Sequence, residues 1–430
     1  MTVRRILVVG AGARQHALCW RLAKEPGIER IIVAPGNPMI DDVADVHSHV
    51  ALTDNDALVT LARSAGVDLV VVGPEEPLVA GLADRLALAG VPCFGPSAAA
   101  ARLEASKAYA RSVCDTAGVQ MATGRSFEDP GSALEYAASL GMPVVIKADG
   151  LAGGKGVAIC ENMAEAERAV RDALIDGRFG QAGRVVVVET WLAGREASVF
   201  ALCDGDSYAL LPAARDHKRA GEGDTGPNTG GMGAYSPIEE LDDTMLAAIG
   251  ESIVVPVLRE MAARGTPFRG ALFCGLMLTA DGPRVLEFNV RLGDPEAQAI
   301  LPRVDAPLAE LMLACANGDL AGSRQLPATA DATVAIALAA AGYPDSARAG
   351  DVIRGIDAAR ATGALVFGAG VARGREETLT TAGGRVLTVV GRGPDLAAAA
   401  DAAYEAADQI DYAGKWYRRD IGRPLVGALA

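Results

Sequence analysis

The segment Leu286–Gln298, LEFNVRLGDPEAQ, combines the pattern of a buried β-strand with charged side chains. Apolar or aromatic residues occupy every second position at its start, as in a buried strand: Leu286, Phe288 and Val290. Successive side chains of a strand point to opposite faces, so an acid, an amide and a base share the other face: Glu287, Asn289 and Arg291. Carboxylate and amide oxygens suit a hard cation such as Mg²⁺. The segment therefore predicts a polar binding face, and leaves open whether Asp294 and Glu296 support it or cap the next helix.

Length and charge limit the classes of protein that the sequence can encode. At 430 residues the chain exceeds one ordinary core and suggests about three domains of ~150 residues each. Its 40 basic and 54 acidic residues give a formal net charge of −14, which argues against nonspecific binding to nucleic acid or to an anionic membrane. We therefore expect no nucleic-acid and no membrane partner, and a local cluster of cations must hold any phosphate group.

The start of the chain, its cysteines and its histidines favour a cytoplasmic protein without a zinc site. MTVRRILVVG leads directly into a strand, without the apolar core of a signal peptide, and no apolar run approaches the ~20 residues of a membrane span. The seven cysteines show no CxxC pair, so buried reduced thiols are expected. The four histidines lack the spacing of zinc ligands: His16, His47, His49 and His217.

The first hundred residues alternate strand-like and helix-like segments. The runs RRILVVG, RIIVAPG, DLVVVGP and VPCFGP are typical of strands, and the segments between them are typical of helices, among them EPLVAGLADRLALAG. This alternation predicts a parallel sheet flanked by helices, with ligands at the carboxyl edge of the strands. The expected fold class is α/β with α+β parts, beginning with an open parallel α/β sheet domain over residues 1–103.

Three further units are expected along the chain. Residues 124–190 combine short strands, helices and a glycine loop, which fits a small lid. Residues 104–123 and 191–328 are expected to form a central mixed-sheet domain, with an antiparallel layer of four strands and helices near 242–263 and 305–317. Residues 329–430 contain their own strands and an Ala-rich helix at 395–409, which predicts a C-terminal α+β domain.

Two glycine-rich turns are candidate phosphate sites. VVGAGARQHA joins the first strand to a helix, but Gln15 replaces the third glycine of a dinucleotide fingerprint and no acid ends the second strand, so a nicotinamide cofactor is not favoured. A helix N-terminus with Gly12 and Arg14 suits one phosphate monoester. KADGLAGGKGV surrounds Lys155 with four glycines after Lys147 and lacks the Walker A pattern, which favours backbone amides and ammonium groups that wrap phosphate oxygens.

A long polar segment, ARDHKRAGEGDTGPNTGGMGAYSP, interrupts the otherwise apolar central region. A disordered surface loop would explain its composition, but a long structureless loop inside a compact domain is usually functional. Its candidate functional side chains are charged or carry an amide: Asp216, His217, Lys218, Arg219 and Asn228.

Together these motifs resemble the ATP-grasp ligases and, among them, the phosphoribosylamine-glycine ligases, also called glycinamide ribonucleotide synthetases. The resemblance runs from residue 6 to residue 422 and is carried by GPEEPLVAGL, FGPS, LEASKAYAR, VIKADGLAGGKGV, DHKR, DTGPNTGGMGAYSP, LEFNVRLGDPEAQ, GGRVLTVVGRG and RRDIG. It implies an ATP-grasp fold and an enzyme that joins glycine to 5-phosphoribosylamine through glycyl phosphate, giving glycinamide ribonucleotide, ADP and phosphate in de novo purine (IMP) biosynthesis. It also implies ATP and Mg²⁺, or Mn²⁺, as cofactors and a monomeric enzyme, and it leaves open a transient contact with the preceding purine-pathway enzyme.

The resemblance also assigns roles to individual residues. It implies two metal ligands: Glu287 and Asn289. It implies contacts with the phosphates, adenine and ribose of ATP: Lys107, Lys147, Lys155, Glu189, Trp191, Leu192 and Glu196. Glycine is expected to bind Arg291, Asp216 and Asn228. Phosphoribosylamine is expected at the first sheet: Gly12, Arg14, Pro35, Gly36, Asn37, Pro74 and Glu75. The catalytic residues are expected to be Arg291, Lys155 and Asp216.

Two segments depart from the family pattern. The first turn reads Gly-Gly-Arg-Glu-His in the family but has Ala13 and Gln15 here, which removes a carboxylate near the expected sugar-phosphate site. FGAGVARG stands where the family has His-Ala-Gly-Thr. Two alternatives stay open: another ATP-grasp carboxylate-amine ligase, including the purine formyl- and carboxy-transferring relatives, and a noncatalytic nucleotide-binding or interaction protein on the same fold. DHKR and DTGPNTGGMGAYSP favour glycine activation over the first alternative.

Overall fold

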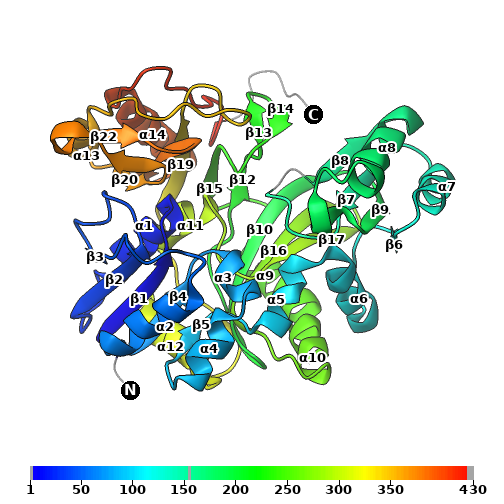
Figure 1. Cartoon of the computed structure of the whole chain (residues 1–430), viewed down its shortest axis with the longest axis horizontal. Helices are drawn as coiled ribbons and strands as arrows, with labels where there is room; N and C mark the ends of the chain where they lie inside the picture. The colour runs from blue at the N-terminus through cyan, green and yellow to red at the C-terminus, as the bar shows by residue number, and fades with distance from the viewer. Residues whose placement is uncertain (1–2, 154–155, 424–430) are drawn as a thin grey trace.

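The computed structural model describes residues 3–153 and 156–423, and its first sheet is parallel. The strand order is β3-β2-β1-β4-β5, and every neighbouring pair is parallel. Its strands are β1 (Arg5–Gly10), β2 (Arg30–Pro35), β3 (Asp45–Val46), β4 (Leu69–Val72) and β5 (Cys93–Phe94). The helices of this unit, blue in Figure 1, are α1 (Ala13–Leu22), α2 (Asn55–Ser64), α3 (Glu75–Val79) and α4 (Leu82–Leu88). The prediction of an N-terminal parallel α/β sheet is confirmed.

The segment expected as a single helix after β4 forms two helices in the structure. α3 ends at Val79 and α4 begins at Leu82, because Gly81 takes a left-handed conformation with φ of 83° at the N-terminus of α4. Glycine adopts this conformation without the steric cost of a Cβ atom. The break keeps α3 short, and Glu75 is its first residue, just beyond the carboxyl end of β4.

A separate antiparallel sheet of order β6-β9-β7-β8 lies at the right of Figure 1, coloured cyan to green. Its strands are β6 (Gly124–Phe127), β7 (Val144–Ala148), β8 (Val157–Cys160) and β9 (Val186–Thr190). Two helices pack on this sheet: α7 (Pro130–Leu140) and α8 (Met163–Val170). Its apolar side chains form a core cluster of their own, distinct from the two larger clusters of the molecule. This sheet and its two helices therefore have their own packing.

The central sheet has the order β17-β16-β10-β11-β18. Its strands are β10 (Arg195–Asp204), β11 (Tyr208–Leu210), β16 (Arg269–Thr279), β17 (Gly282–Asn289) and β18 (Arg324–Gln325). All neighbours are antiparallel except β11 and β18, so the expected antiparallel layer is confirmed. The helices around it are α5 (Ala98–Ala105), α6 (Lys107–Ala117), α9 (Asp243–Ile249), α10 (Val255–Ala263) and α12 (Leu308–Asn317), whereas α11 (Glu296–Ile300) packs on α1 and on the C-terminal sheet.

β17 contains a bulge that corrects one expectation about its two faces. Consecutive residues of β16 pair with Glu287 and with Val285, so Leu286 is an extra residue in the ladder. Val285 and Phe288 are buried, whereas Leu286 is half-buried and lines the same cleft as Glu287. The prediction that Leu286 belongs to the buried face is therefore wrong, because strict alternation assumes a regular strand.

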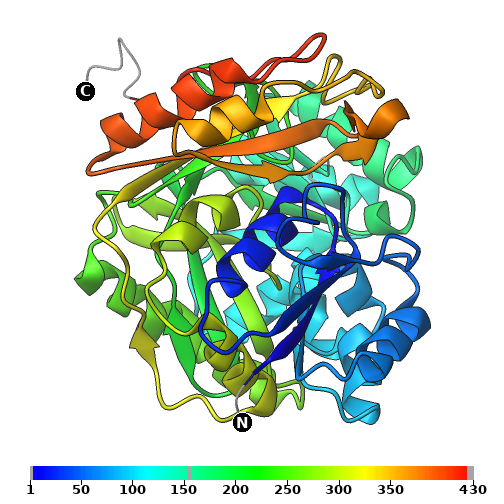
Figure 2. The same ribbon diagram turned by 90° about the vertical axis from the view of Figure 1, so that its left-hand side faces the viewer.

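The C-terminal sheet combines strands from two parts of the chain. It is antiparallel throughout, with the order β12-β15-β19-β23-β20. β12 (Arg215–Asp216) and β15 (Gly233–Ser236) belong to the polar segment, whereas β19 (Ala332–Ala339), β20 (Leu365–Gly368) and β23 (Arg385–Gly393) come from the C-terminal part. Figure 2 shows the strands that come from the C-terminal part of the chain, yellow-orange to red, across the top of the molecule, with α14 (Leu396–Gln409) and α13 (Ile356–Ala361) on them.

The polar segment is ordered rather than a loose surface loop. Between β12 and β15 it forms a hairpin of β13 (Arg219–Gly221) and β14 (Thr225–Asn228). A second small hairpin in the C-terminal part joins β21 (Val371–Arg373) to β22 (Leu379–Thr381). Within residues 3–153 and 156–423, no helix is both long and apolar enough to cross a membrane.

Candidate active site

A cleft of about 1810 Å³ lies where the four sheets approach one another. Its wall includes Arg14 after β1, Lys147 on β7, Glu287 on β17, Asp216 on β12 and Arg385 on β23. Polar and charged groups from segments far apart in the sequence therefore face one space. This arrangement places the cleft at the carboxyl edge of the parallel sheet, where open α/β sheets bind ligands.

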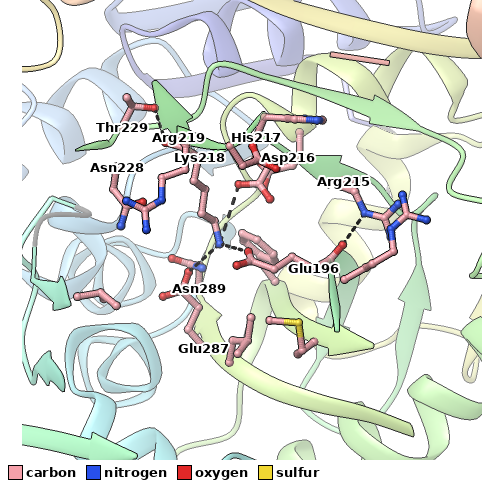
Figure 3. A pocket seen from close by; sticks show the side chains of 18 of the residues that line it. Glu196, Arg215, Asp216, His217, Lys218, Arg219, Asn228, Thr229, Glu287 and Asn289 are labelled. Atoms are coloured by element: carbon pink, nitrogen blue, oxygen red, sulfur yellow. Dashed lines mark hydrogen bonds and ion pairs between the residues drawn. The ribbon is translucent and has the colours of Figure 1, made fainter. Parts of the chain in front are cut away.

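Lys218 is at the centre of a group of carboxylates in this cleft (Figure 3). Its Nζ lies 2.8 Å from Oε2 of Glu196, 3.9 Å from Oε1 of Glu287 and 4.0 Å from Oδ2 of Asp216. Burial lowers the pKa of Lys218, but these three carboxylates outweigh burial and hold the pKa well above its ordinary value. The ammonium group is therefore charged, and it links β10, β12 and β17 within the cleft.

Glu287 and Asn289 offer oxygen donors next to this ammonium group. Burial raises the pKa of Glu287, but nearby Lys218, Lys147 and Lys107 lower it below its ordinary value, so the carboxylate is ionised at neutral pH. Asn289 is 9% exposed, and its Oδ1 accepts a hydrogen bond of 3.1 Å from Arg291. In the described residues no group of three or more His, Cys, Asp and Glu side chains could hold a metal ion. One carboxylate and one amide oxygen suit Mg²⁺, which usually takes its other ligands from water and phosphates.

Arg291 joins residues that sequence reasoning had assigned to different substrates. Its Nε donates to Glu75 at 3.1 Å, and its Nη2 donates to Glu104 at 3.0 Å. With the bonds to Asn289 and to the Leu292 carbonyl, these contacts engage four of the five N–H donors of the guanidinium within the described chain. The two carboxylates outweigh burial and raise the pKa of Arg291 further. The expected glycine anchor and the expected sugar-site residue Glu75 are thus in direct contact.

Glu104 is a site residue that sequence reasoning did not single out. It lies on α5, is 8% exposed, and accepts a hydrogen bond of 2.7 Å from the backbone N–H of Val290. Burial raises its pKa to about 7, although Arg291 opposes that shift. The sequence did carry a signal for Glu104, because it lies between the apolar residues Leu103 and Ala105 of LEASK. An acid in such a place tends to be buried, and a buried carboxylate needs polar partners.

Two of the basic residues expected over the ATP phosphates line the cleft next to the β6-β9-β7-β8 sheet. Lys147 of β7 donates to the Leu286 carbonyl at 3.1 Å and forms an ion pair with Glu189 of β9. Lys107, the first residue of α6, donates to the Gly150 carbonyl at 3.3 Å, and burial lowers its pKa. Lys155 lies outside the described residues. The carboxylate of Glu189 is thus paired with two cations of the chain, Lys147 and Arg111.

The segment expected at adenine and ribose follows β9. Trp191 is 45% exposed and lines the cleft together with Leu192, and the apolar Leu151 and Ile159 line it as well. Glu196, the expected ribose partner, pairs with Lys218. The cleft therefore offers both apolar side chains and a carboxylate to a ligand.

Asp216 and Asn228, the residues expected to bind the substrate glycine, both line the cleft. Burial raises the pKa of Asp216 to about 7, although Lys218 opposes the shift and Glu296 adds to it. Glu296 is 3% exposed, begins α11 and accepts a hydrogen bond of 3.3 Å from Ser198. Asp294 forms an ion pair of 3.3 Å with Arg385. The two acids of GDPE thus both line the cleft, and Glu296 also starts a helix.

The residues expected to hold phosphoribosylamine are only partly at the cleft. Arg14 and Glu75 line it, and a Cβ atom on Gly12 would lie 3.7 Å from the carboxylate of Asp294. Burial, with Arg291 nearby, lowers the pKa of Arg14 to about 10. The cleft lining does not include five of the expected residues, all within the described chain: Gly12, Pro35, Gly36, Asn37 and Pro74.

Asn37 and Gln15 have structural partners that the sequence did not predict. The Asn37 carboxamide donates to the carbonyls of Ala11, at 2.6 Å, and of Gly368 on β20, at 2.9 Å. Gln15 accepts a hydrogen bond of 2.9 Å from Gly12, and a Cβ atom on Gly73 would lie only 2.0 Å from its Nε2. Gln15 therefore packs in the turn after β1, and Asn37 ties the first domain to the C-terminal sheet.

Comparisons with known proteins cover almost the whole chain. Models of the phosphoribosylglycinamide synthetase family match the N domain at residues 4–104, the ATP-grasp (A) domain at 105–297 and the C domain at 333–424. The phosphoribosylamine--glycine ligase of Caulobacter vibrioides is 48% identical over 417 residues, which are 97% of this chain and 97% of that protein.

Solved structures agree with this result. The crystal structure of phosphoribosylamine--glycine ligase from Thermotoga maritima has a TM-score of 0.83 at 32% identity and covers 97% of this chain and 99% of that one. The biotin carboxylase domain of 2-oxoglutarate carboxylase from Hydrogenobacter thermophilus, with a TM-score of 0.72 at 17% identity over 97% and 92% of the chains, shares the fold. The expected ATP-grasp fold is confirmed, and the chain belongs to the phosphoribosylglycinamide synthetase family.

Proposed function

We propose that this chain catalyses the ATP-dependent ligation of glycine to 5-phosphoribosylamine, giving glycinamide ribonucleotide, ADP and phosphate in purine biosynthesis. The observation that carries the proposal is the joint position of oxygen donors, lysines and Arg291 in one cleft. Glu287 and Asn289 lie between Lys218 and Arg291, with contacts of 3.9 Å and 3.1 Å at the two ends. Together with family membership, this site favours phosphoryl transfer to a carboxylate.

The proposed reaction has two steps. A carboxylate oxygen of glycine attacks the γ-phosphorus of ATP, so that a P–O bond forms to glycine and ADP leaves. The amine nitrogen of phosphoribosylamine then attacks the carbonyl carbon of glycyl phosphate, phosphate leaves with the shared oxygen, and the nitrogen loses a proton. Such chemistry asks the protein for positioning and charge neutralisation rather than for a covalent nucleophile.

Mg²⁺, or Mn²⁺, would be held by Glu287 and Asn289 and would neutralise charge on the ATP phosphates. Lys107, Lys147 and Lys155 would bind the phosphate oxygens, because ammonium groups stabilise charge that moves during transfer. Trp191 and Leu192 would bind adenine. Because the Glu189 side chain is already paired with Arg111 and Lys147, Glu189 would contact adenine through its backbone. Glu196 would face the ribose.

Glycine would lie between the carboxylates and Arg291. The free N–H of Arg291 would bind the glycine carboxylate, while Asp216 would bind the ammonium group with Asn228 nearby. Phosphoribosylamine would lie against Gly12, Arg14 and Glu75. Pro35, Gly36 and Pro74 remain proposed sugar-site residues, whereas Asn37 would support this site through its bonds to Ala11 and Gly368.

The path of one oxygen atom tests this mechanism. Glycine labelled with ¹⁸O in both carboxylate oxygens should give inorganic phosphate that contains one ¹⁸O, since the bridging oxygen of glycyl phosphate leaves with phosphorus. Mass spectrometry of the phosphate measures the transfer. Unlabelled phosphate during full turnover would contradict the acyl phosphate.

The proposal includes the cellular and domain organisation of the enzyme. We propose a cytoplasmic monomer that meets the preceding purine-pathway enzyme transiently, tested by fractionation, light scattering and crosslinking. Domain limits at residues 103, 123, 190 and 328 are proposed as well, with 124–190 as a lid, and limited proteolysis near these positions tests them.

A further inference from the structure

A buried network of charges joins the central domain to the lid. Nη2 of Arg111, on α6, donates to Oε2 of Glu189, on β9, at 2.6 Å. The other oxygen of that carboxylate pairs with the ammonium group of Lys147, on β7. The side chains of Arg111, Glu189 and Lys147 are 8%, 4% and 10% exposed. The three charged groups are thus close together and poorly screened by water, so their electrostatic interaction is strong.

The network lies at the point where the chain enters and leaves the lid. Nη1 of Arg111 donates to the carbonyl of Ala122 at 2.9 Å, two residues before β6 begins. The return strand is tied to the same place, because the N–H of Thr190 donates to the carbonyl of Thr123 at 2.8 Å. Arg111 therefore holds the entry segment and, through Glu189, the exit strand.

The absence of a side chain at Gly124 allows the close contact between Arg111 and Glu189. A Cβ atom at Gly124 would lie 2.6 Å from Cβ of Glu189 and 3.0 Å from Nη2 of Arg111. Any larger side chain there would displace the ion pair. The position of Glu189 between its two cations is therefore fixed by packing as well as by charge.

The charges of the network do not balance. Two cations share one carboxylate, so the three groups carry one net positive charge, and all three line the cleft. Without Arg111, Glu189 would neutralise Lys147 completely. With Arg111 present, one oxygen of the Glu189 carboxylate pairs with Arg111. Glu189 therefore neutralises Lys147 only in part, and the Lys147 ammonium still attracts an anion in the cleft.

We propose that Arg111 is a positioning residue for the nucleotide phosphates, which acts through Glu189 on Lys147. This role rests on the proposed function, since it requires that Lys147 faces the phosphates of ATP. Arg111 itself touches no substrate. It keeps one net positive charge at the base of the lid, next to Lys147.

A charge-balance experiment tests the role. Arg111→Met should weaken binding of a nonhydrolysable ATP analogue with Mg²⁺ by about tenfold, as measured by calorimetric titration. The double variant Arg111→Met/Glu189→Gln restores one net positive charge and should bind the analogue within about threefold of the wild type. Arg111→Lys keeps the charge but cannot contact Glu189 and the Ala122 carbonyl in the same two-pronged way, so its affinity should lie between those of the wild type and Arg111→Met.

Matched variants separate charge from stability. Arg21→Met removes another partly buried arginine–carboxylate pair, with Glu25 at 2.8 Å, far from the lid; it should lower the melting temperature and leave ATP-analogue affinity unchanged. If the folded double variant binds as weakly as Arg111→Met, or if Arg111→Met binds like the wild type, the inference is overturned and the proposed function stands. A wild-type protein that binds no ATP analogue would overturn both.

Discussion

The ammonium nitrogen of Lys218 lies 3.9 Å from Oε1 of Glu287, so a cation of the chain already neutralises the proposed metal ligand. Lys218→Met should lower kcat by about 10²- to 10³-fold, because three carboxylates lose their shared cation and a charge next to the transferred phosphoryl group is removed. Steady-state ADP release measures the effect. Lys24→Met, which removes a lysine that lies over Trp20, serves as the control and should leave kcat unchanged. Wild-type kcat in Lys218→Met would contradict this role.

Removal of the Glu287 carboxylate tests the metal site. Glu287→Ala should reduce Mg²⁺-dependent turnover by about 10³-fold, since a metal contributes several kcal/mol to charge stabilisation in phosphoryl transfer. The fold should persist, as judged by circular dichroism, and Glu310→Gln at an exposed site should keep full activity. Normal activity of Glu287→Ala with Mg²⁺ present would show that the metal assignment is wrong.

Nucleotide binding should close the lid over the cleft. Glycyl phosphate reacts with water, so closure is needed to exclude solvent from the acyl phosphate. Hydrogen exchange of the peptide that covers residues 150–156 should slow when ATP and Mg²⁺ are added, whereas exchange in α12 should not change. Equal exchange rates of the 150–156 peptide with and without the nucleotide would count against closure.

His217 should contribute to the stability of the fold an amount that is lost as the pH is lowered, opposite in sign to the contributions of Asp216 and Glu104, whose pKa values burial raises to about 7. Burial, with Arg418 nearby, lowers the pKa of His217 from 6.5 to about 4. Between these two pH values His217 binds a proton in the unfolded chain but not in the folded chain, so its own contribution to the free energy of unfolding decreases as pH falls, by up to about 3 kcal/mol.

His217→Gln should remove this contribution, so that lowering the pH from 7.5 to 5 destabilises the variant less than it destabilises the wild type, or stabilises the variant more. Urea unfolding at pH 7.5 and at pH 5 measures it, and His49→Gln, at an exposed position, should retain the wild-type dependence. An unchanged difference between the two pH values in His217→Gln would contradict the buried neutral imidazole.

The alternation of strands and helices was sufficient to predict the parallel sheet, because hydrophobic periodicity records which faces are buried. The strand from Gly282 to Asn289 was also predicted, and Glu287, Asn289 and Arg291 do line one cleft. The bulge at Leu286 was not, since it depends on the pairing between β16 and β17 rather than on local composition.

Long-range partners were the main features that the sequence could not predict. Asn37 looked like a sugar-site residue, yet its carboxamide bonds to Gly368, 331 residues away. Arg111 and Glu104 are ordinary helix residues in the sequence, and their importance comes from carboxylates and cations that the fold brings to them. In the sequence, Gln15 stands where the family has a carboxylate and so suggests a lost charge. In the structure its side chain packs against Gly10, Gly12 and Gly73.

The most direct test of the proposed function is ADP release measured in a coupled assay, with phosphoribosylamine generated in place. We predict that ADP release requires both glycine and phosphoribosylamine, and that one glycinamide ribonucleotide forms for each ADP. Full coupled turnover with bicarbonate or formate in place of glycine would contradict this account and would favour another ATP-grasp ligase.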